Sequence, residues 1–261
     1  MLDIHQSPAK KGNSRLVKAQ RSRGQDNLEW LRDHLDTTEE SAVLVLLGGK
    51  DVLSHRLRTA QSHARHDLSP SHWSDVFILA DPAQVGTQVS AQATPKAAST
   101  SSQNLPQLYG ISLTPQNGFG FPPLTNALQK MTMEPFLEPK RFPNIALLRI
   151  PVAYVTVFEA LEQFKKQSNV VNATELLARW LAYGWGVAPN PLLEGLGLPG
   201  AVCMDAVFSA ANYDLTPGLA NHSCCPEAIW QAAKWWQEFH QEEDEAGRAI
   251  SGAYVVSDTL P

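Results

Sequence analysis

The apolar run from Ala42 to Leu47 constrains the fold more than any other feature of the sequence. Its six residues are Ala-Val-Leu-Val-Leu-Leu, and Gly48-Gly49 ends it. A short apolar run that ends at turn residues is typical of a buried strand or a short segment of the core. Apolar residues make up 43% of the 261-residue chain, so the chain can build a core around this segment.

Other segments show strand and helix patterns along most of the chain. Turn residues bound an aromatic and β-branched run at 73–79, and Pro143 precedes a similar run at 144–150. Asp26 offers an N-cap, and Pro226 fits the first position of a long helix. The predicted strands cover 42–47, 73–79, 108–113, 144–150 and 253–256, and the predicted helices cover 28–35, 51–61, 124–133, 154–166, 172–181, 203–212 and 226–239.

Charge and composition exclude some classes of function. The net charge is -5, so the whole molecule is not a nucleic-acid binder by charge. No run approaches the roughly 20 apolar residues of a membrane span, and the N-terminus lacks the apolar region of a signal peptide. Three cysteines without a disulfide spacing favour reduced thiols. We therefore expect a cytoplasmic protein without a membrane span, while export without a cleaved signal stays open.

The composition also predicts how the chain is divided. Residues 1–24 are basic and poor in apolar residues, which predicts a disordered tail. Residues 83–104 are rich in Gln, Ala, Ser and Thr without periodicity, which predicts a flexible insertion. We expect one domain over 25–245 that contains this insertion, followed by a C-terminal segment at 246–261.

Cys203 is the candidate nucleophile. It follows the turn signal Leu198-Pro199-Gly200, and Val207, Ala210 and Ala211 then recur at helical spacing. Cys203 should therefore lie at or near a helix N-terminus, where backbone N–H groups and the helix dipole favour a thiolate. The alternative is that Cys203 is a small buried apolar residue, as most free cysteines are.

A metal site is a further alternative near the second cysteine segment. His222, Cys224 and Cys225 could contribute ligands, but adjacent cysteines rarely bind one ion with good geometry. The histidines His55, His63 and His66 likewise lack a tight ligand pattern. The sequence therefore predicts no metal and no cofactor.

Several short motifs together resemble the permuted papain-fold cysteine hydrolases, the YiiX/YaeF-like branch of the NlpC/P60 superfamily. The stretch from Leu198 to Gly218 is similar to that family's cysteine helix and the Thr-Pro segment after it, and Ser223 to Ile229 resembles its entry to the next helix. Upstream, Lys50-Asp51-Val52-Leu53 resembles the family's opening motif. The base strand precedes the cysteine helix, which is the permuted order, and the resemblance spans roughly 41–240.

The resemblance implies an α+β fold in which a small antiparallel sheet or barrel packs against helices, including the cysteine helix. It also implies a catalytic site made of Cys203, a histidine on the 74–79 strand and a polar residue on the next strand. This chain departs from that pattern because Asp75 stands where the family has histidine. A carboxylate is a poor base for a thiol and would raise the thiol pKa. His72 or His222 could replace the missing base, and Ser112 is the candidate orienting residue.

Two functions follow from the resemblance. In the first, the protein is a thiol-dependent hydrolase of the amidase or peptidase kind, or an acyltransferase. Cys203 would then attack a peptide-like or lipid-like acyl substrate, and His72 would transfer the proton. In the second, Asp75 marks a degenerate site, and the protein binds without cleaving. The sequence leaves enzymatic activity, substrate and oligomeric state open.

Overall fold

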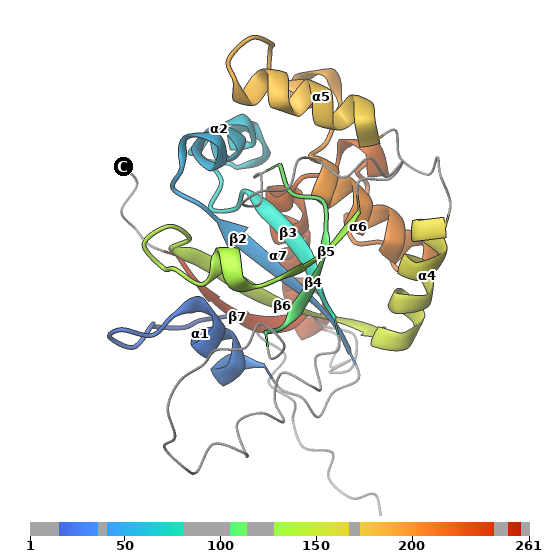
Figure 1. Cartoon of the computed structure of the whole chain (residues 1–261). Helices are drawn as coiled ribbons and strands as arrows, with labels where there is room; N and C mark the ends of the chain where they lie inside the picture. The colour runs from blue at the N-terminus through green and yellow to red at the C-terminus, as the bar shows by residue number, and fades with distance from the viewer. Residues whose placement is uncertain are drawn as a thin grey trace, which may run out of the picture.

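The computed structural model describes residues 16–35, 41–80, 105–113, 128–166, 173–242 and 250–256 (Figure 1). Seven strands form one mixed sheet in the order β1-β7-β6-β2-β3-β4-β5. The strands are β1 (Leu16–Lys18), β2 (Ser41–Gly48), β3 (Asp75–Ala80), β4 (Gln107–Gly110), β5 (Gln129–Thr132), β6 (Asn144–Ala153) and β7 (Ser251–Val255). The helices are α1 (Asn27–His34), α2 (Val52–Ala60), α4 (Tyr154–Lys166), α5 (Ala173–Gly184), α6 (Pro199–Ala210) and α7 (Pro226–Glu242).

Strand β2 lies at the centre of the sheet and confirms the strand predicted from its apolar run. It pairs antiparallel with β3 on one side and with β6 on the other. Leu44, for example, lies opposite Ile78 of β3 and Leu148 of β6. Both faces of β2 are buried because the sheet is covered on both sides. An uninterrupted apolar run is the expected sequence for such a strand.

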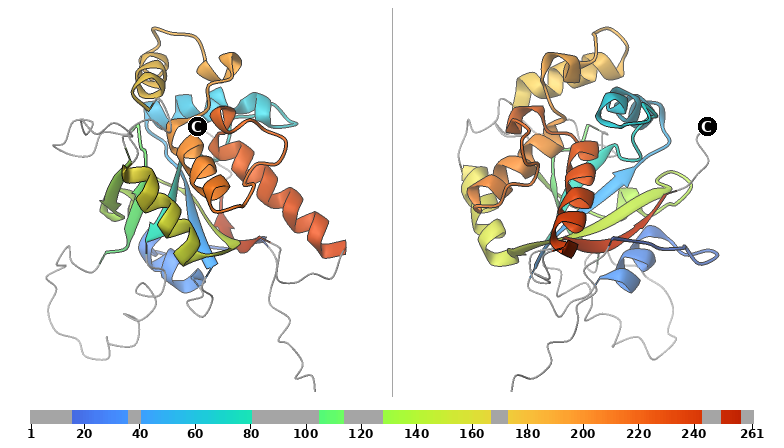
Figure 2. Two further views of the ribbon diagram at one scale, coloured as in Figure 1. Left: turned by 90° about the vertical axis from the view of Figure 1, so that its right-hand side faces the viewer. Right: turned by 180° about the vertical axis from the view of Figure 1, so that it is seen from behind.

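Two separate cores cover the two faces of the sheet. Helices α4, α5, α6 and α7 contribute the larger core on one face, and α1 with the short helix at Glu134–Phe136 contributes the smaller core on the other (Figures 1 and 2). Strand alternation divides β3 between them. Val76 and Ile78 belong to the larger core, whereas Phe77 and Leu79 belong to the smaller one.

Side-chain caps begin α1 and α2, and the cap at Asp26 confirms the N-cap predicted there. Asp26 and Glu29 form a capping box at α1, in which each side chain accepts from the other residue's backbone N–H. Asp51 accepts from the Ser54 N–H and Ser54 hydroxyl at the start of α2. Helix α7 begins at Pro226, as predicted.

Three predictions need correction or fall outside the described residues. The helix predicted over 124–133 is wrong for its second half, because Gln129–Thr132 forms β5 and pairs with β4, while 124–127 lie outside the described residues. The disordered tail predicted over 1–24 is wrong for 16–24, because β1 within this segment pairs parallel with β7. Residues 1–15 and the insertion at 83–104 lie outside the described residues.

The fold class is mixed α/β. The expected sheet was small and antiparallel, or a barrel. The observed sheet has one parallel pair, β1 with β7, and it is open because β1 and β5 form its two edges. Helices pack against the sheet as expected, and α6 is among them.

Candidate functional site

Cys203 is the fifth residue of α6 rather than one of its first residues. The helix begins at Pro199, so Pro199-Gly200 opens the helix and does not separate it from the preceding loop. Proline suits the first helical position because its missing N–H would have no partner there. The prediction that the helix starts at Cys203 is therefore wrong by four residues.

The Cys203 thiol is fully buried, with 0% of the residue exposed. It lies in the larger core together with Val202, Met204 and Val207. Burial raises the pKa of the Cys203 thiol to about 12, because a thiolate loses its hydration in these surroundings. The helix dipole acts mainly within the first turn, so it does not offset this effect. The thiol is therefore protonated at neutral pH.

Asp75 begins β3 and is 5% exposed. The Ser74 hydroxyl donates to its Oδ2 at 2.7 Å, and the Ser112 hydroxyl donates to its Oδ1 at 3.0 Å. Asp75 is therefore buried and hydrogen-bonded although it stands at the end of a strand. The structure does bring together Asp75 and Ser112, which were two of the predicted site residues.

The surroundings of Asp75 raise its pKa to about 6. Burial is the largest cause, since it disfavours the charged carboxylate. The hydrogen bonds from Ser74 and Ser112 oppose this effect because they stabilise the carboxylate, and the Asp51 charge raises the pKa slightly. A carboxyl group with a pKa near 6 can exchange a proton near neutral pH, but it remains a weak base for a thiol whose pKa is about 12.

The start of α6 meets the segments that carry Asp75 and Ser112. A Cβ added to Gly200 would lie 2.7 Å from the Ile111 carbonyl oxygen and 3.5 Å from that of Val76. Only glycine allows the helix to approach these two backbones so closely. The segments expected to form the site are therefore adjacent.

The side chains nevertheless point to different faces of the sheet. Along β3, Asp75 lies two residues before Phe77, so it is on the same face of the sheet as Phe77, which belongs to the smaller core. Val76 and Cys203 belong to the larger core on the other face. Because successive side chains of a strand point to opposite faces, Asp75 is directed away from the face that α6 covers. The arrangement therefore separates the carboxylate from the thiol.

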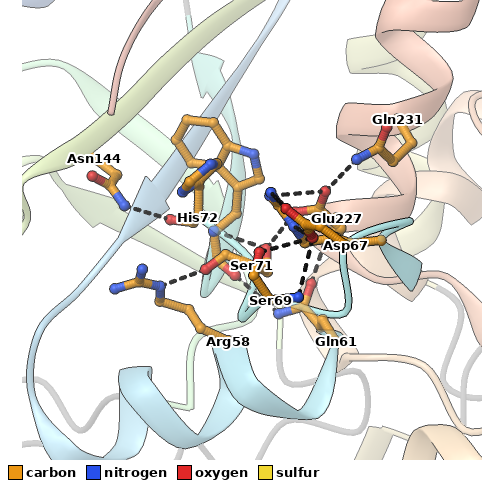
Figure 3. A network of polar contacts seen from close by, with 11 residues as sticks. Arg58, Gln61, Asp67, Ser69, Ser71, His72, Asn144, Glu227 and Gln231 are labelled. Atoms are coloured by element: carbon orange, nitrogen blue, oxygen red, sulfur yellow. Dashed lines mark hydrogen bonds and ion pairs between the residues drawn. The ribbon is translucent and has the colours of Figure 1, made fainter. Parts of the chain in front are cut away.

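His72 lies just before β3 and is half-buried. Its backbone carbonyl accepts from Asn144 Nδ2 at 3.0 Å, and its ring meets the edge of Trp73 at 6.2 Å between ring centroids (Figure 3). The His72 carbonyl oxygen also lies close to Gly48. A Cβ added to Gly48 would be only 1.9 Å from this oxygen. These contacts fix the His72 backbone. The His72 imidazole does not contribute to the pKa of Cys203, because burial alone accounts for the rise of that pKa.

A second group of buried polar residues was not predicted as a site. Thr216 Oγ1 donates to Asp205 Oδ1 at 2.9 Å, and burial raises the pKa of Asp205 to about 6. Burial, and secondarily the Asp205 charge, raises the pKa of the Cys224 thiol, whereas a hydrogen bond with Thr216 lowers it. Asp205 and Thr216 stand in the two motifs of the resemblance. Their contact could not be predicted from the sequence, because the two residues stand eleven positions apart and on different elements.

Metal ligands do not gather in the described part of the chain. No group of three or more His, Cys, Asp and Glu side chains there could hold a metal ion. The hypothesis of a site at His222, Cys224 and Cys225 therefore gains no support. Among the described helices, none is long and apolar enough to cross a membrane.

Comparison with known proteins adds no family. No family model, no curated protein and no solved structure matches this chain. The resemblance to the permuted papain-fold hydrolases therefore depends on the short motifs described above.

Proposed function

We propose that this protein is a degenerate relative of the permuted papain-fold hydrolases, and that it binds its ligand without cleaving an acyl bond. The observation that carries the proposal is the complete burial of the Cys203 thiol, whose pKa is about 12. A nucleophilic cysteine needs a partly exposed and electropositive setting. Asp75, at the position of the family's histidine, supplies a negative charge instead and is directed toward the other face of the sheet.

A thiol-dependent hydrolase or acyltransferase is the second candidate. It is favoured by the close approach of the α6 start to the backbones of Val76 and Ile111. In this reading α6 would have to open locally, and His72 would act as the base for attack by Cys203 on a peptide-like or lipid-like acyl group. Such opening would expose the thiol, so the two candidates differ in a property that can be measured.

The decisive experiment measures alkylation of each cysteine by iodoacetamide at pH 7, with peptide mapping by mass spectrometry. The pKa shift of Cys203 from 9.0 to about 12 lowers its thiolate fraction about a thousandfold. Cys203 should therefore react at least that much more slowly in the native protein than in the urea-unfolded chain. Cys224 and Cys225 are internal controls, because both are also buried.

Fast native labelling of Cys203 would contradict the binding proposal and favour the hydrolase. Rates equal to or above that of the unfolded chain would show an activated and accessible thiol. A Cys203→Ala variant provides the complementary measurement. The binding proposal expects this variant to retain its ligand, whereas the hydrolase requires loss of activity.

A further inference from the structure

An open groove runs along α7 beside the Thr-Pro segment that follows α6, with a volume of about 490 Å³. This volume is within the range of ligand sites. The 216–219 loop forms one wall, α7 forms the other, and one residue comes from the short helix before β3. The lining residues are Ala64, Thr216, Pro217, Gly218, Leu219, Ala228, Gln231, Ala232 and Trp235.

Two large apolar side chains at the groove are exposed to water. Trp235 is 48% exposed and Leu219 is 38% exposed. A half-exposed tryptophan offers a large and rigid apolar surface to a partner at little cost in side-chain entropy. Because its rim is exposed, the groove would enclose only one side of a ligand. This geometry suits a peptide segment that lies along the surface better than a small molecule that needs an enclosed cavity.

Gln231 supplies a fixed hydrogen-bond acceptor in the groove wall. Its Nε2 donates to Glu227 Oε1 at 2.5 Å (Figure 3). Since a carboxylate only accepts hydrogen bonds, the amide nitrogen must face Glu227, and Oε1 of Gln231 points elsewhere. No described residue donates to this oxygen. The side chain is therefore held in place with one acceptor free for a ligand N–H.

The buried carboxylate beside Gln231 already has hydrogen-bond and ion-pair partners. Glu227 is fully buried and accepts from the Ser71 hydroxyl at 2.6 Å, while Arg65 lies 3.6 Å from it and also pairs with Asp67. None of the nine lining residues carries a charge. Glu227 and Asp67 share one cation, Arg65, so these side chains carry one excess negative charge. An acidic ligand group would find no free cation on the lining, so the groove disfavours an acidic segment.

We propose that this groove binds an extended peptide segment without acidic side chains. One apolar side chain of the segment packs against Trp235 and Leu219, and its backbone N–H donates to Gln231 Oε1. The inference goes beyond the proposed function because it holds whether or not Cys203 is reactive. Its tests use binding to the groove, so they are independent of thiol labelling.

The experiment uses N-acetylated, C-amidated Ala-Xaa-Ala peptides, with Xaa as Leu, Phe or Glu. Binding to the full chain is measured by saturation-transfer NMR and isothermal titration calorimetry at millimolar peptide. The Leu and Phe peptides should bind saturably, and the Glu peptide should bind more weakly. Methylation of the backbone nitrogen of Xaa removes the donor to Gln231 and should weaken binding about fivefold.

Two variants locate the site. Trp235→Ala should weaken binding by about tenfold or more, because a tryptophan in an interface often contributes much of its affinity. Ala232→Leu should block binding by filling the groove, and it keeps Trp235 in place. The matched control is Trp185→Ala, which removes a 74% exposed tryptophan at the end of α5 and should bind as the wild type does. Circular dichroism checks that each variant is folded.

Several results would overturn the proposal. One is that no peptide binds saturably, and another is that the Glu peptide binds most tightly. A third is that Trp235→Ala and Ala232→Leu bind the peptides as the wild type does. Equal loss in Trp185→Ala would show that the effect is not specific to the groove. A change of oligomeric state in Trp235→Ala, seen by sedimentation, together with absent peptide binding, would assign the groove to a second copy of the chain instead.

Discussion

Replacing Asp75 by Asn should stabilise the protein at neutral pH and change its stability little in acid. The pKa of Asp75 is about 6 in the folded protein, against 3.8 for an ordinary aspartate. This difference is about 2 pKa units, and each unit corresponds to about 1.4 kcal/mol, so ionised Asp75 costs about 3 kcal/mol of folding free energy. An asparagine carries no charge and avoids this cost. The Ser74 and Ser112 hydroxyls can still bond to it, since a hydroxyl both donates and accepts.

The pH range of the effect follows from proton binding. Between about pH 4 and pH 6 the folded protein binds the Asp75 proton more tightly than the unfolded chain does. The contribution of Asp75 to stability is therefore most favourable below about pH 4, and it is lost as the pH rises through about 6. The free energy of unfolding of Asp75→Asn relative to wild type should increase by about 3 kcal/mol between about pH 4 and about pH 7.5.

Urea unfolding followed by tryptophan fluorescence at a series of pH values measures this difference. Asp205 titrates in the same range, but it is present in both proteins and cancels in the comparison. Ser112→Ala is the matched variant, because it removes one hydrogen bond that lowers the Asp75 pKa and should move the transition to higher pH. A difference between wild type and Asp75→Asn that stays constant over the range would refute the reasoning.

Three other substitutions test the packing and the helix start by urea unfolding at neutral pH. Gly48→Ala should cost about 3 kcal/mol, because its Cβ would lie 1.9 Å from the His72 carbonyl oxygen, and an unchanged midpoint would mean that this contact is not tight. Ser71→Ala should cost about 2 kcal/mol by removing a donor from the buried Glu227 carboxylate, and a loss below the error of the assay would contradict that role. Asp26→Ala should cost about 1 kcal/mol and speed amide exchange in the first turn of α1, whereas unaltered exchange there would argue against the cap.

Local patterns explain which elements could be predicted from the sequence. Strand β2 was predictable because a central strand is buried on both faces and its sequence is apolar throughout. Helix α1 was predictable because its cap is local in sequence. By contrast, Gln129–Thr132 has no strand pattern of its own and forms β5 because β4 offers an unpaired edge. Leu16–Lys18 likewise becomes a strand through pairing with a segment more than 230 residues away.

The candidate site shows the same division between local and long-range information. The candidate residues Asp75 and Ser112 are hydrogen-bonded, because Asp75 begins β3 and Ser112 follows β4, the strand that pairs with β3. The resemblance does not reveal the burial of Asp75, which depends on how Ser74 and Ser112 pack around the carboxylate. The position of Cys203 was misjudged because a Pro-Gly pair can either end one element or begin the next. Which of these occurs is decided by the contact of Gly200 with Ile111, and a linear sequence does not show this contact.

The pairing of β7 with both β1 and β6 affects how the protein can be synthesised. Strand β6 keeps an open edge until residues 251–255 have left the ribosome, although its other edge can pair with β2 much earlier. An unpaired edge of an apolar strand is a template for association with other chains. During translation, the nascent chain must therefore carry this exposed edge through the synthesis of α4, α5, α6 and α7. The pairing of β6 with β7 can form only after α7 has been synthesised, and this delay sets how long the β6 edge depends on protection from aggregation.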